Sequence, residues 1–280
     1  MAVLPWTCPS CKASVTTAFC PQCGEEPLKP RDLTLHGFAE KAFHDFTSID
    51  ARTLRSVRTV ILRPGELTLA WFQGVRKPYV LPLALFLIAN VVFVALQLST
   101  GQHVFNSSLD SHLHQQDWST LAQSLLSRRL EVTGRSIEEY APIFDRRVAI
   151  NAKSLVVLMS LAFSPLLSVV FLRVKRPFMV HVVFSLHFYA FLLLLMSASL
   201  LVAGFSAFLG FGGIEAAVVD NVLSVAMLLI CTAYIYRAIG PVYESQGARR
   251  VVSAVVLAFG VAAFVLGYRL ALFLITLYST

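Results

Sequence analysis

The sequence predicts an all-α integral membrane protein, a five-helix transmembrane bundle with interfacial amphipathic helices and a small cysteine-rich unit at the amino terminus. Three observations predict this fold class. The 280-residue chain is 56% hydrophobic and only 14% charged, whereas soluble domains carry about 25% charged residues. Five apolar segments each approach the ~20 residues needed to cross a bilayer. Four cysteines stand in two close pairs near the start of the chain. The chain is therefore divided into residues 1–30, 31–78 and 79–280.

The cysteines of residues 1–30 have the spacing C-x2-C-x8-C-x2-C, with ligand candidates at Cys8, Cys11, Cys20 and Cys23. Each C-x2-C turn presents two thiolates to one ion, and two turns complete the tetrahedral four-sulfur shell of structural zinc. Two disulfides or an iron–sulfur centre are the alternatives, but a reducing cytoplasm disfavours disulfides. We therefore predict a zinc ribbon with one structural Zn2+, whose metal supplies its folding free energy.

The charges of this amino-terminal unit argue against a nucleic-acid partner. Lys12 and Lys29 are balanced by Glu25 and Glu26, so the unit has no basic stripe that could follow a phosphate backbone. Catalysis at the ion is not expected either, because four sulfur ligands leave no open coordination position. A docking module for a protein partner is the predicted role.

Residues 31–78 form a basic, amphipathic juxtamembrane neck. Apolar residues between 33 and 46 recur at helical spacing, and Asp50 is a candidate N-cap for a second helix that ends at Pro64–Gly65. On this second helix we expect Leu54, Val57, Val60 and Ile61 to share one side and the arginines the other. Basic side chains here attract anionic lipid headgroups by about 1 kcal/mol each. The lipid-facing basic residues are Arg52, Arg55, Arg58, Arg76 and Lys77. A dedicated headgroup or anionic-ligand site is the alternative to a simple orientation signal.

The membrane domain, residues 79–280, contains the five predicted spans. Pro82 is expected in the first turn of the first span, where its missing N–H costs little. Pro165 lies inside the second span, where a kink is expected. The spans are predicted at about 79–98, 154–172, 179–203, 217–238 and 251–276.

Loop charges predict the orientation of these spans. The turn after the second span carries Arg173, Lys175 and Arg176, whereas the 204–220 turn has no basic residue. By the positive-inside rule the amino terminus is cytoplasmic and the carboxyl terminus is extracytoplasmic. Since residues 1–30 have no apolar signal-peptide core, the first span is expected to direct the chain to the membrane.

The extracytoplasmic loop 99–153 is the one long connection between the predicted spans. Its stretch 117–134 and the segment IEEYAPIFDRR are each predicted to form a helix. The loop also contains His103, His112 and His114. A weak metal site at the H-x-H pair and simple solvation of these residues are the two interpretations.

The third span carries two histidines, His181 and His187, which are six residues apart. They point about 120° away from each other around a helix of 3.6 residues per turn, so they cannot chelate one ion from the same face. A hydrogen bond to another helix is one interpretation, with Asn90, Ser160, Ser164 and Tyr234 as candidate partners. A proton relay or ligand site in the bundle, formed by His181, His187 and Asn90, is another, and haem ligation is a third.

Three segments together resemble a known family: FCPQCG in the ribbon, RTVILRPGELTLAWFQGVRKPYVLPLALFL from neck to first span, and HVVFSLHFYAFLLLL in the third span. The set resembles a bacterial family of uncharacterised multi-pass membrane proteins with an amino-terminal zinc ribbon. The resemblance covers most of the chain, least of all the loop 99–153, and implies a place in the bacterial inner membrane but no assigned activity. The five-span plan also resembles the Yip1-type membrane domain, which implies trafficking, scaffolding or membrane-shaping roles.

Three functions are compatible with these residues. The first is a non-enzymatic anchoring, assembly or scaffolding factor that docks a partner through its zinc ribbon. The second is a small-molecule or ion transporter or channel that uses His187. The third is a membrane-embedded enzyme that acts on a lipid or quinone, with His181 or His187 as general base. No catalytic residue is predicted, and the first hypothesis is preferred.

Overall fold

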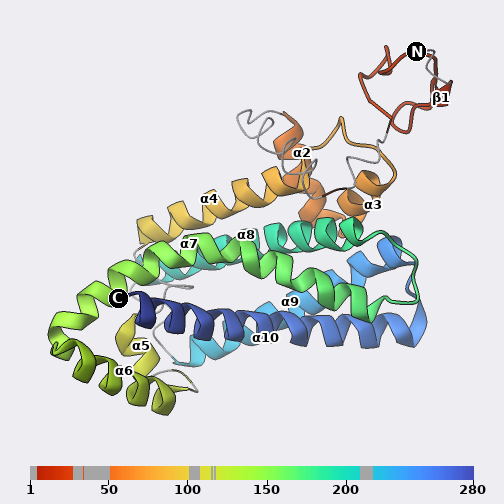
Figure 1. Ribbon diagram of the computed structural model, residues 1–280. Coiled ribbons are helices and arrows are strands. Elements are labelled where there is room, and N and C mark those ends of the chain that lie inside the picture. The colour runs from red at the N-terminus through yellow and green to blue at the C-terminus, as the bar shows by residue number, and fades with distance from the viewer. Residues whose placement is uncertain are drawn as a thin grey trace.

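The computed structural model describes residues 5–27, 34, 51–100, 108–114, 116, 118–208 and 217–280. Long helices lie side by side, and a small two-stranded unit stands at one end of them (Figure 1). The predicted first helix of the neck, between 33 and 46, falls outside the described residues apart from residue 34. The elements are β1 (Trp6–Thr7), β2 (Ser14–Val15), α2 (Ala51–Leu62), α3 (Glu66–Phe72), α4 (Pro82–Thr100), α5 (Leu109–His114), α6 (Ser119–Thr133), α7 (Ile137–Val170), α8 (Phe178–Phe208), α9 (Ala217–Tyr243) and α10 (Gly247–Ser279).

Four helices of the described chain are long and apolar enough to cross a bilayer, as expected of a membrane protein. They are Pro82–Thr100, Phe178–Val202, Val225–Tyr243 and Gly247–Ser279. Pro82 is the first residue of α4, as predicted. The remaining predicted span, 154–172, lies mostly within α7, whose described apolar part, Leu158–Val170, is shorter than the others. The count of five spans therefore stays a prediction.

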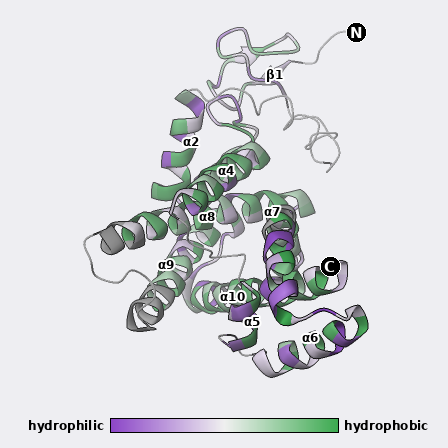
Figure 2. Ribbon diagram, turned by 90° about the vertical axis from the view of Figure 1, so that its left-hand side faces the viewer, coloured by the Kyte–Doolittle hydropathy of each residue, from purple (hydrophilic) through white to green (hydrophobic). Residues whose placement is uncertain are grey.

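Helix α8 is the centre of the bundle. Of its span, 83% is buried within the protein, against 28% for α4 and 33% for α10. Helix α4 packs along one side of α8 and α7 along another, and α10 packs against both α7 and α9. Green, apolar segments dominate these helices in Figure 2. A run with few polar residues on any face, such as α8, is the pattern expected of a helix that is surrounded on all sides.

Helix α2 turns its small polar face toward the bundle, with Thr53, Ser56, Thr59 and Val60 buried. Leu54 is 74% exposed and Ile61 43% exposed. The prediction that Val60 shares one side with these two residues is therefore wrong. The reason is a tertiary hydrogen bond, in which the Val80 N–H donates to Ser56 Oγ at 3.0 Å. This bond draws the small polar side of α2 against the chain that leads into α4.

Helix α3 follows a sharp turn at Gly65, where φ is 87°. A Cβ at this position would lie 2.5 Å from the carbonyl oxygen of Ala238. Two features therefore require glycine at position 65: the left-handed backbone and the close approach to α9. This turn allows α3 to pack against α8 and α9, although the neck was expected to lie at the membrane surface.

The loop 99–153 contains α5, α6 and the first turns of α7. The helix predicted over 117–134 is confirmed as α6. The segment IEEYAPIFDRR is helical but is not a separate helix, because α7 continues from Ile137 to Val170. A capping box at Ser136 and Glu139 begins this helix, and no glycine interrupts the following residues.

The two ends of the bundle are formed by different elements. The turn 171–177 and the turn 244–246 lie at the same end as the cysteine-rich unit (Figure 1). An ion pair joins these turns, with Arg176 Nη2 2.7 Å from Glu244 Oε1, and the Arg176 guanidinium lies 4.7 Å above the ring of Phe72. The opposite end carries α5, α6 and the carboxyl terminus, where the Tyr140 hydroxyl donates to the Leu277 carbonyl at 3.2 Å.

Candidate metal centre and buried polar site

The two cysteine turns of the ribbon share one backbone pattern. In the first turn the Cys8 N–H donates to the Ala13 carbonyl, and the Lys12 N–H donates to the Cys8 carbonyl. The second turn repeats both bonds, from Cys20 to Glu25 and from Gly24 to Cys20. Lys12 and Gly24 occupy the same left-handed position, with φ of 63° and 73°. A short antiparallel pairing of β1 with β2 flanks the first turn.

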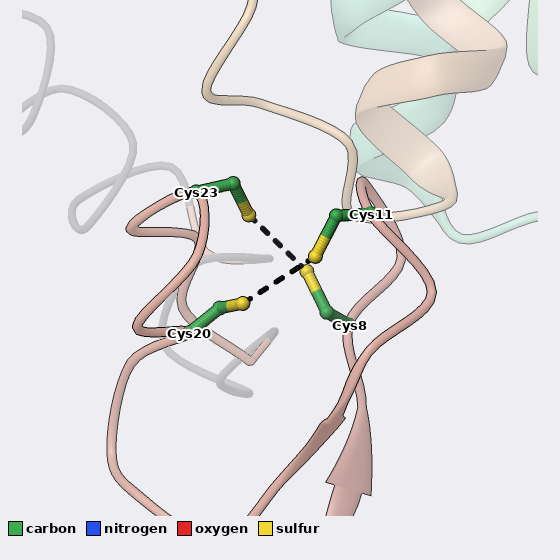
Figure 3. Close-up of side chains that lie close together, drawn as sticks. All are labelled: Cys8, Cys11, Cys20 and Cys23. Atoms are coloured by element: carbon green, nitrogen blue, oxygen red, sulfur yellow. Dashed lines mark hydrogen bonds between the residues drawn. The ribbon is translucent and has the colours of Figure 1, made fainter.

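The four thiol sulfurs converge on one point between the turns (Figure 3). All four lie within 4.8 Å of one another. Cys8 Sγ is 3.4 Å from Cys23 Sγ, and Cys11 Sγ is 3.5 Å from Cys20 Sγ. Tetrahedral ligands at ~2.3 Å from an ion are separated by about 3.8 Å, so the cluster fits a four-sulfur metal site. All four cysteines are free thiols, and the arrangement can bind a metal ion.

The backbone of the second turn favours a thiolate at Cys20. Burial, the largest influence, raises the pKa of this thiol, but hydrogen bonds from the backbone at Cys23 and Gln22 and from the thiols of Cys11 and Cys23 lower it to about 7. Hydrogen bonds to the charged form of a group stabilise that form. A thiolate is the species that binds a metal, so this turn favours the charged form of Cys20. The pKa of Cys23 in the same turn is instead raised to about 12: its backbone hydrogen bond at Glu25 lowers it, but burial and the thiols of Cys8, Cys20 and Cys11 raise it.

A buried carboxylate joins the ribbon to the membrane domain. Glu25 follows the second cysteine turn and is only 4% exposed. Its Oε2 accepts hydrogen bonds from the backbone N–H groups of Arg76 at 3.0 Å and Lys77 at 2.9 Å. The same oxygen accepts the hydroxyl proton of Ser10 at 2.6 Å. From the sequence, Glu25 was assigned only a role in the charge balance of the unit; its position directly after Cys23–Gly24 was the available signal for more.

The two histidines of α8 bind different neighbours. His187 Nδ1 lies 2.9 Å from Thr68 Oγ1 on α3. His181 Nδ1 lies 2.9 Å from the Tyr243 hydroxyl at the end of α9, and the two rings are stacked at 5.4 Å. Their spacing predicted that they do not share one site, and in the structure each histidine has its own hydrogen-bond partner. The partners themselves differ from the candidates Asn90, Ser160, Ser164 and Tyr234.

The three residues of the possible intramembrane site are therefore not gathered around one point. Asn90 is half-buried on α4, and no hydrogen bond joins it to His181 or His187, all three of which the structure describes. Thr68 and Tyr243 were missed because their partners are 119 and 62 residues away in the chain. A threonine in the otherwise apolar segment LTLAWF was the only local signal.

A small cavity lies beside His187, between α3, α8 and the chain that leads into α4. Its walls include Trp71, Arg76, Tyr79 and Val80, and its volume is about 20 Å³. A cavity of this size holds about one water molecule, so it has no room for a lipid or quinone in this conformation. The Arg76 guanidinium lies 4.9 Å above the Trp71 ring, which holds this part of the neck against α3.

The basic neck residues have two different environments. Arg55 and Arg58 are exposed on α2, and Arg52 is half-buried. Lys77 is exposed beside the ribbon, whereas Arg76 is half-buried against Trp71. Only part of the predicted basic set thus lies on an open surface.

The loop histidines also separate. His112 is 1% exposed and lies 4.9 Å from the ring of Phe273, whereas His114 is exposed and pairs with Asp110 at 2.9 Å. The two rings therefore do not form a common metal site. His103 lies outside the described residues.

A protein-family model described as "Protein of unknown function (DUF3667)" matches residues 50–94. The chain is similar to that family over this stretch. The matched stretch contains α2, α3 and the first part of α4, and so includes Thr68 and the loop that Glu25 contacts. The cysteines and both α8 histidines lie outside it. No curated protein and no solved structure matches the chain.

Proposed function

We propose that this chain is an anchoring, assembly or scaffolding factor of the bacterial inner membrane, with a structural Zn2+ held by Cys8, Cys11, Cys20 and Cys23. The observation that carries the proposal is the cluster of four sulfurs within 4.8 Å. A shell of four thiolates is closed, so its metal folds a surface rather than activating a substrate. The ribbon would present that surface to a protein partner in the cytoplasm.

The buried histidines support a scaffold rather than a reaction centre. Each one pairs with a hydroxyl on another helix. Such bonds between membrane helices contribute about 0.6–2 kcal/mol each to packing. His187 therefore ties α3 to α8, and His181 ties α8 to α9.

The proposed orientation has the amino terminus in the cytoplasm and the carboxyl terminus outside. The basic turn 171–177 lies at the ribbon end of the bundle, which agrees with the positive-inside rule. On α2, exposed Leu54 and Ile61 lie beside exposed Arg55 and Arg58. This mixed apolar and basic surface suits the interface of an anionic leaflet.

The metal content of the purified protein tests the proposal. The wild-type protein and the variant Cys231→Ser, which changes a buried cysteine of α9, should each carry about one equivalent of zinc. The double variant Cys8→Ser, Cys11→Ser should carry none. A photo-crosslinker placed at Phe19, which is 58% exposed on the ribbon, should capture a protein partner only when the metal is bound. An unchanged zinc content in the double variant contradicts the proposal. Equal crosslinking of the partner with and without metal contradicts it as well.

A transporter, or an enzyme acting on a lipid or quinone, is the second candidate. Buried His187 beside a water-sized cavity is the observation that favours a transporter, whereas this cavity has no room for the lipid or quinone that the enzyme would need. A His187→Ala variant that folds and retains its zinc but loses flux or turnover would support this candidate. A variant that only becomes less stable would support the scaffold.

A further inference from the structure

The second cysteine turn controls the position of Glu25. The Cys20 N–H donates to the backbone carbonyl of Glu25 at 2.8 Å, and the Gly24 N–H donates back to the Cys20 carbonyl at 2.7 Å. Glu25 is therefore part of the loop that presents Cys20 and Cys23. Any change that unfolds this turn must also move the Glu25 side chain.

One carboxylate oxygen connects three segments. Glu25 Oε2 accepts the hydroxyl of Ser10 from the first cysteine turn and two consecutive backbone N–H groups, of Arg76 and Lys77, from the neck. A buried carboxylate is tolerated only where donors replace its water, and charge-assisted bonds are about twice as strong as neutral ones. These three donors replace the water that the Glu25 carboxylate loses on burial. The carboxylate therefore holds both cysteine turns against the neck.

The surfaces around this carboxylate fit closely. A Cβ added at Gly24 would lie 3.0 Å from Lys77 Cε and 3.5 Å from Lys77 Nζ. A Cβ added at Gly74 would lie 3.4 Å from Cγ of Pro9. An ion with four thiolate ligands carries a net charge of about −2, and the ammonium of Lys77 lies beside the turn that bears it. Charge and shape thus favour the docked position when the metal is bound.

The contacted loop reaches into the membrane domain. Arg76 lies above Trp71 of α3, and the Val80 N–H is bonded to Ser56 of α2. Residues 75, 76 and 79–81 also form a wall of the cavity beside His187. A displacement of Arg76 and Lys77 would therefore change the neck and this cavity together.

We propose that Glu25 is a metal-dependent clamp, which docks the ribbon onto residues 74–77 and orders the juxtamembrane loop only while the four cysteines hold their ion. The proposal rests on the structural metal of the proposed function and extends it: the ion organises not only the ribbon but also the entry to α4. The occupant of the ribbon surface around Glu25 is the chain's own neck, so a cytoplasmic partner would bind another part of the ribbon, such as the exposed Phe19.

Hydrogen exchange of the loop tests the clamp in the full-length protein in detergent. In the metal-bound wild-type protein the peptide over residues 73–81 should be protected, because two of its amides donate to Glu25. In Glu25→Ala this peptide should exchange about tenfold faster or more, while zinc stays at about one equivalent. Glu25→Gln, which keeps an acceptor oxygen but loses the charge, should have a smaller effect. Gln22→Ala, at an exposed position of the same cysteine turn, should have none.

Removal of the metal is the decisive comparison. Chelation, or the double variant Cys8→Ser, Cys11→Ser, should raise loop exchange as much as Glu25→Ala does, with peptides of α8 and α10 unchanged as a test of folding. Equal protection in wild type and Glu25→Ala overturns the clamp. Protection that survives removal of the metal overturns its metal dependence. A wild-type protein that binds no metal at all overturns the proposed function itself. Failure of the clamp and failure of the proposed metal site therefore give different results.

Discussion

The two ends of the bundle each carry a small unit held in place by a carboxylate. At the ribbon end, Glu25 accepts the N–H groups of Arg76 and Lys77. At the opposite end, Asp145 Oδ1 accepts the N–H of Leu109 at 2.8 Å, at the start of α5. The same chemistry therefore attaches the ribbon to the neck and α5 to the long helix α7.

The forces that fold the two units are different. The ribbon has a separate buried cluster of three side chains within the described residues, Cys8, Val15 and Cys20. The unit of α5 and α6 contributes Leu109, Leu113, Ala122 and Leu126 to the main core of the protein. Three small side chains bury too little apolar surface to offset the conformational entropy of folding. The proposed ion would therefore supply the folding free energy of the ribbon, whereas α5 and α6 depend on packing.

Substitution of Phe144 by alanine should have the largest effect on stability. Phe144 is fully buried, with its ring 5.9 Å from that of Phe273. The cavity left behind should lower the free energy of unfolding by about 3–5 kcal/mol, measured by denaturation in detergent. The neighbouring Ile143→Ala, at a side chain 41% exposed, should have a much smaller effect. Loss of zinc from the ribbon in Phe144→Ala would contradict the independence of the two units.

Acidification should weaken the α5–α6 unit through His112. Burial, and then the positive charge of Arg269, lower the pKa of His112 from 6.5 to about 4. The folded state thus binds this proton less readily than the unfolded state, so the stabilisation is complete above pH 6.5 and is lost as the pH falls to about 4. The full effect is about 3 kcal/mol. Hydrogen exchange of α5 and α6 between pH 7 and 4 measures it.

His112→Phe is the matching variant for this pH effect. It keeps an aromatic ring against Phe273 and cannot be protonated, so its α5–α6 exchange should lack this pH dependence. His114→Phe, at the exposed neighbour, should retain it. The ribbon is expected to lose its metal on acidification in all three proteins, because protons compete for the thiolates. An identical pH response in wild type and His112→Phe would exclude His112 as the cause.

Thr68→Val should have the smallest effect. The change removes the hydroxyl bonded to His187 and leaves a buried ring nitrogen without its partner, at a cost of about 1–3 kcal/mol. Thr232→Val is the control, because the Thr232 hydroxyl donates to the Leu228 carbonyl within its own helix. Equal unfolding free energies for the two variants would mean that the bond between α3 and α8 contributes nothing to stability.

The sequence was sufficient for features that depend on spacing within one segment. The convergence of the four thiols follows from two C-x2-C turns, and the position of α4 follows from Pro82 and the apolar run after it. The almost uninterrupted apolar composition of α8 agrees with its burial at the centre of the bundle. The second helix of the neck was predicted less well, since amphipathic spacing placed Val60 with Leu54 and Ile61, whereas Val60 faces the bundle.

By itself the sequence determined the membrane class, the candidate metal ligands and the two histidines that needed an intramembrane partner. Only the tertiary structure decided what those groups contact: Thr68 for His187, Tyr243 for His181, and the Arg76–Lys77 backbone for Glu25. The physical reason is the separation along the chain between the residues that interact. Metal spacing and apolar length are properties of one short segment, but a hydrogen-bond partner far along the chain is selected by how whole helices pack.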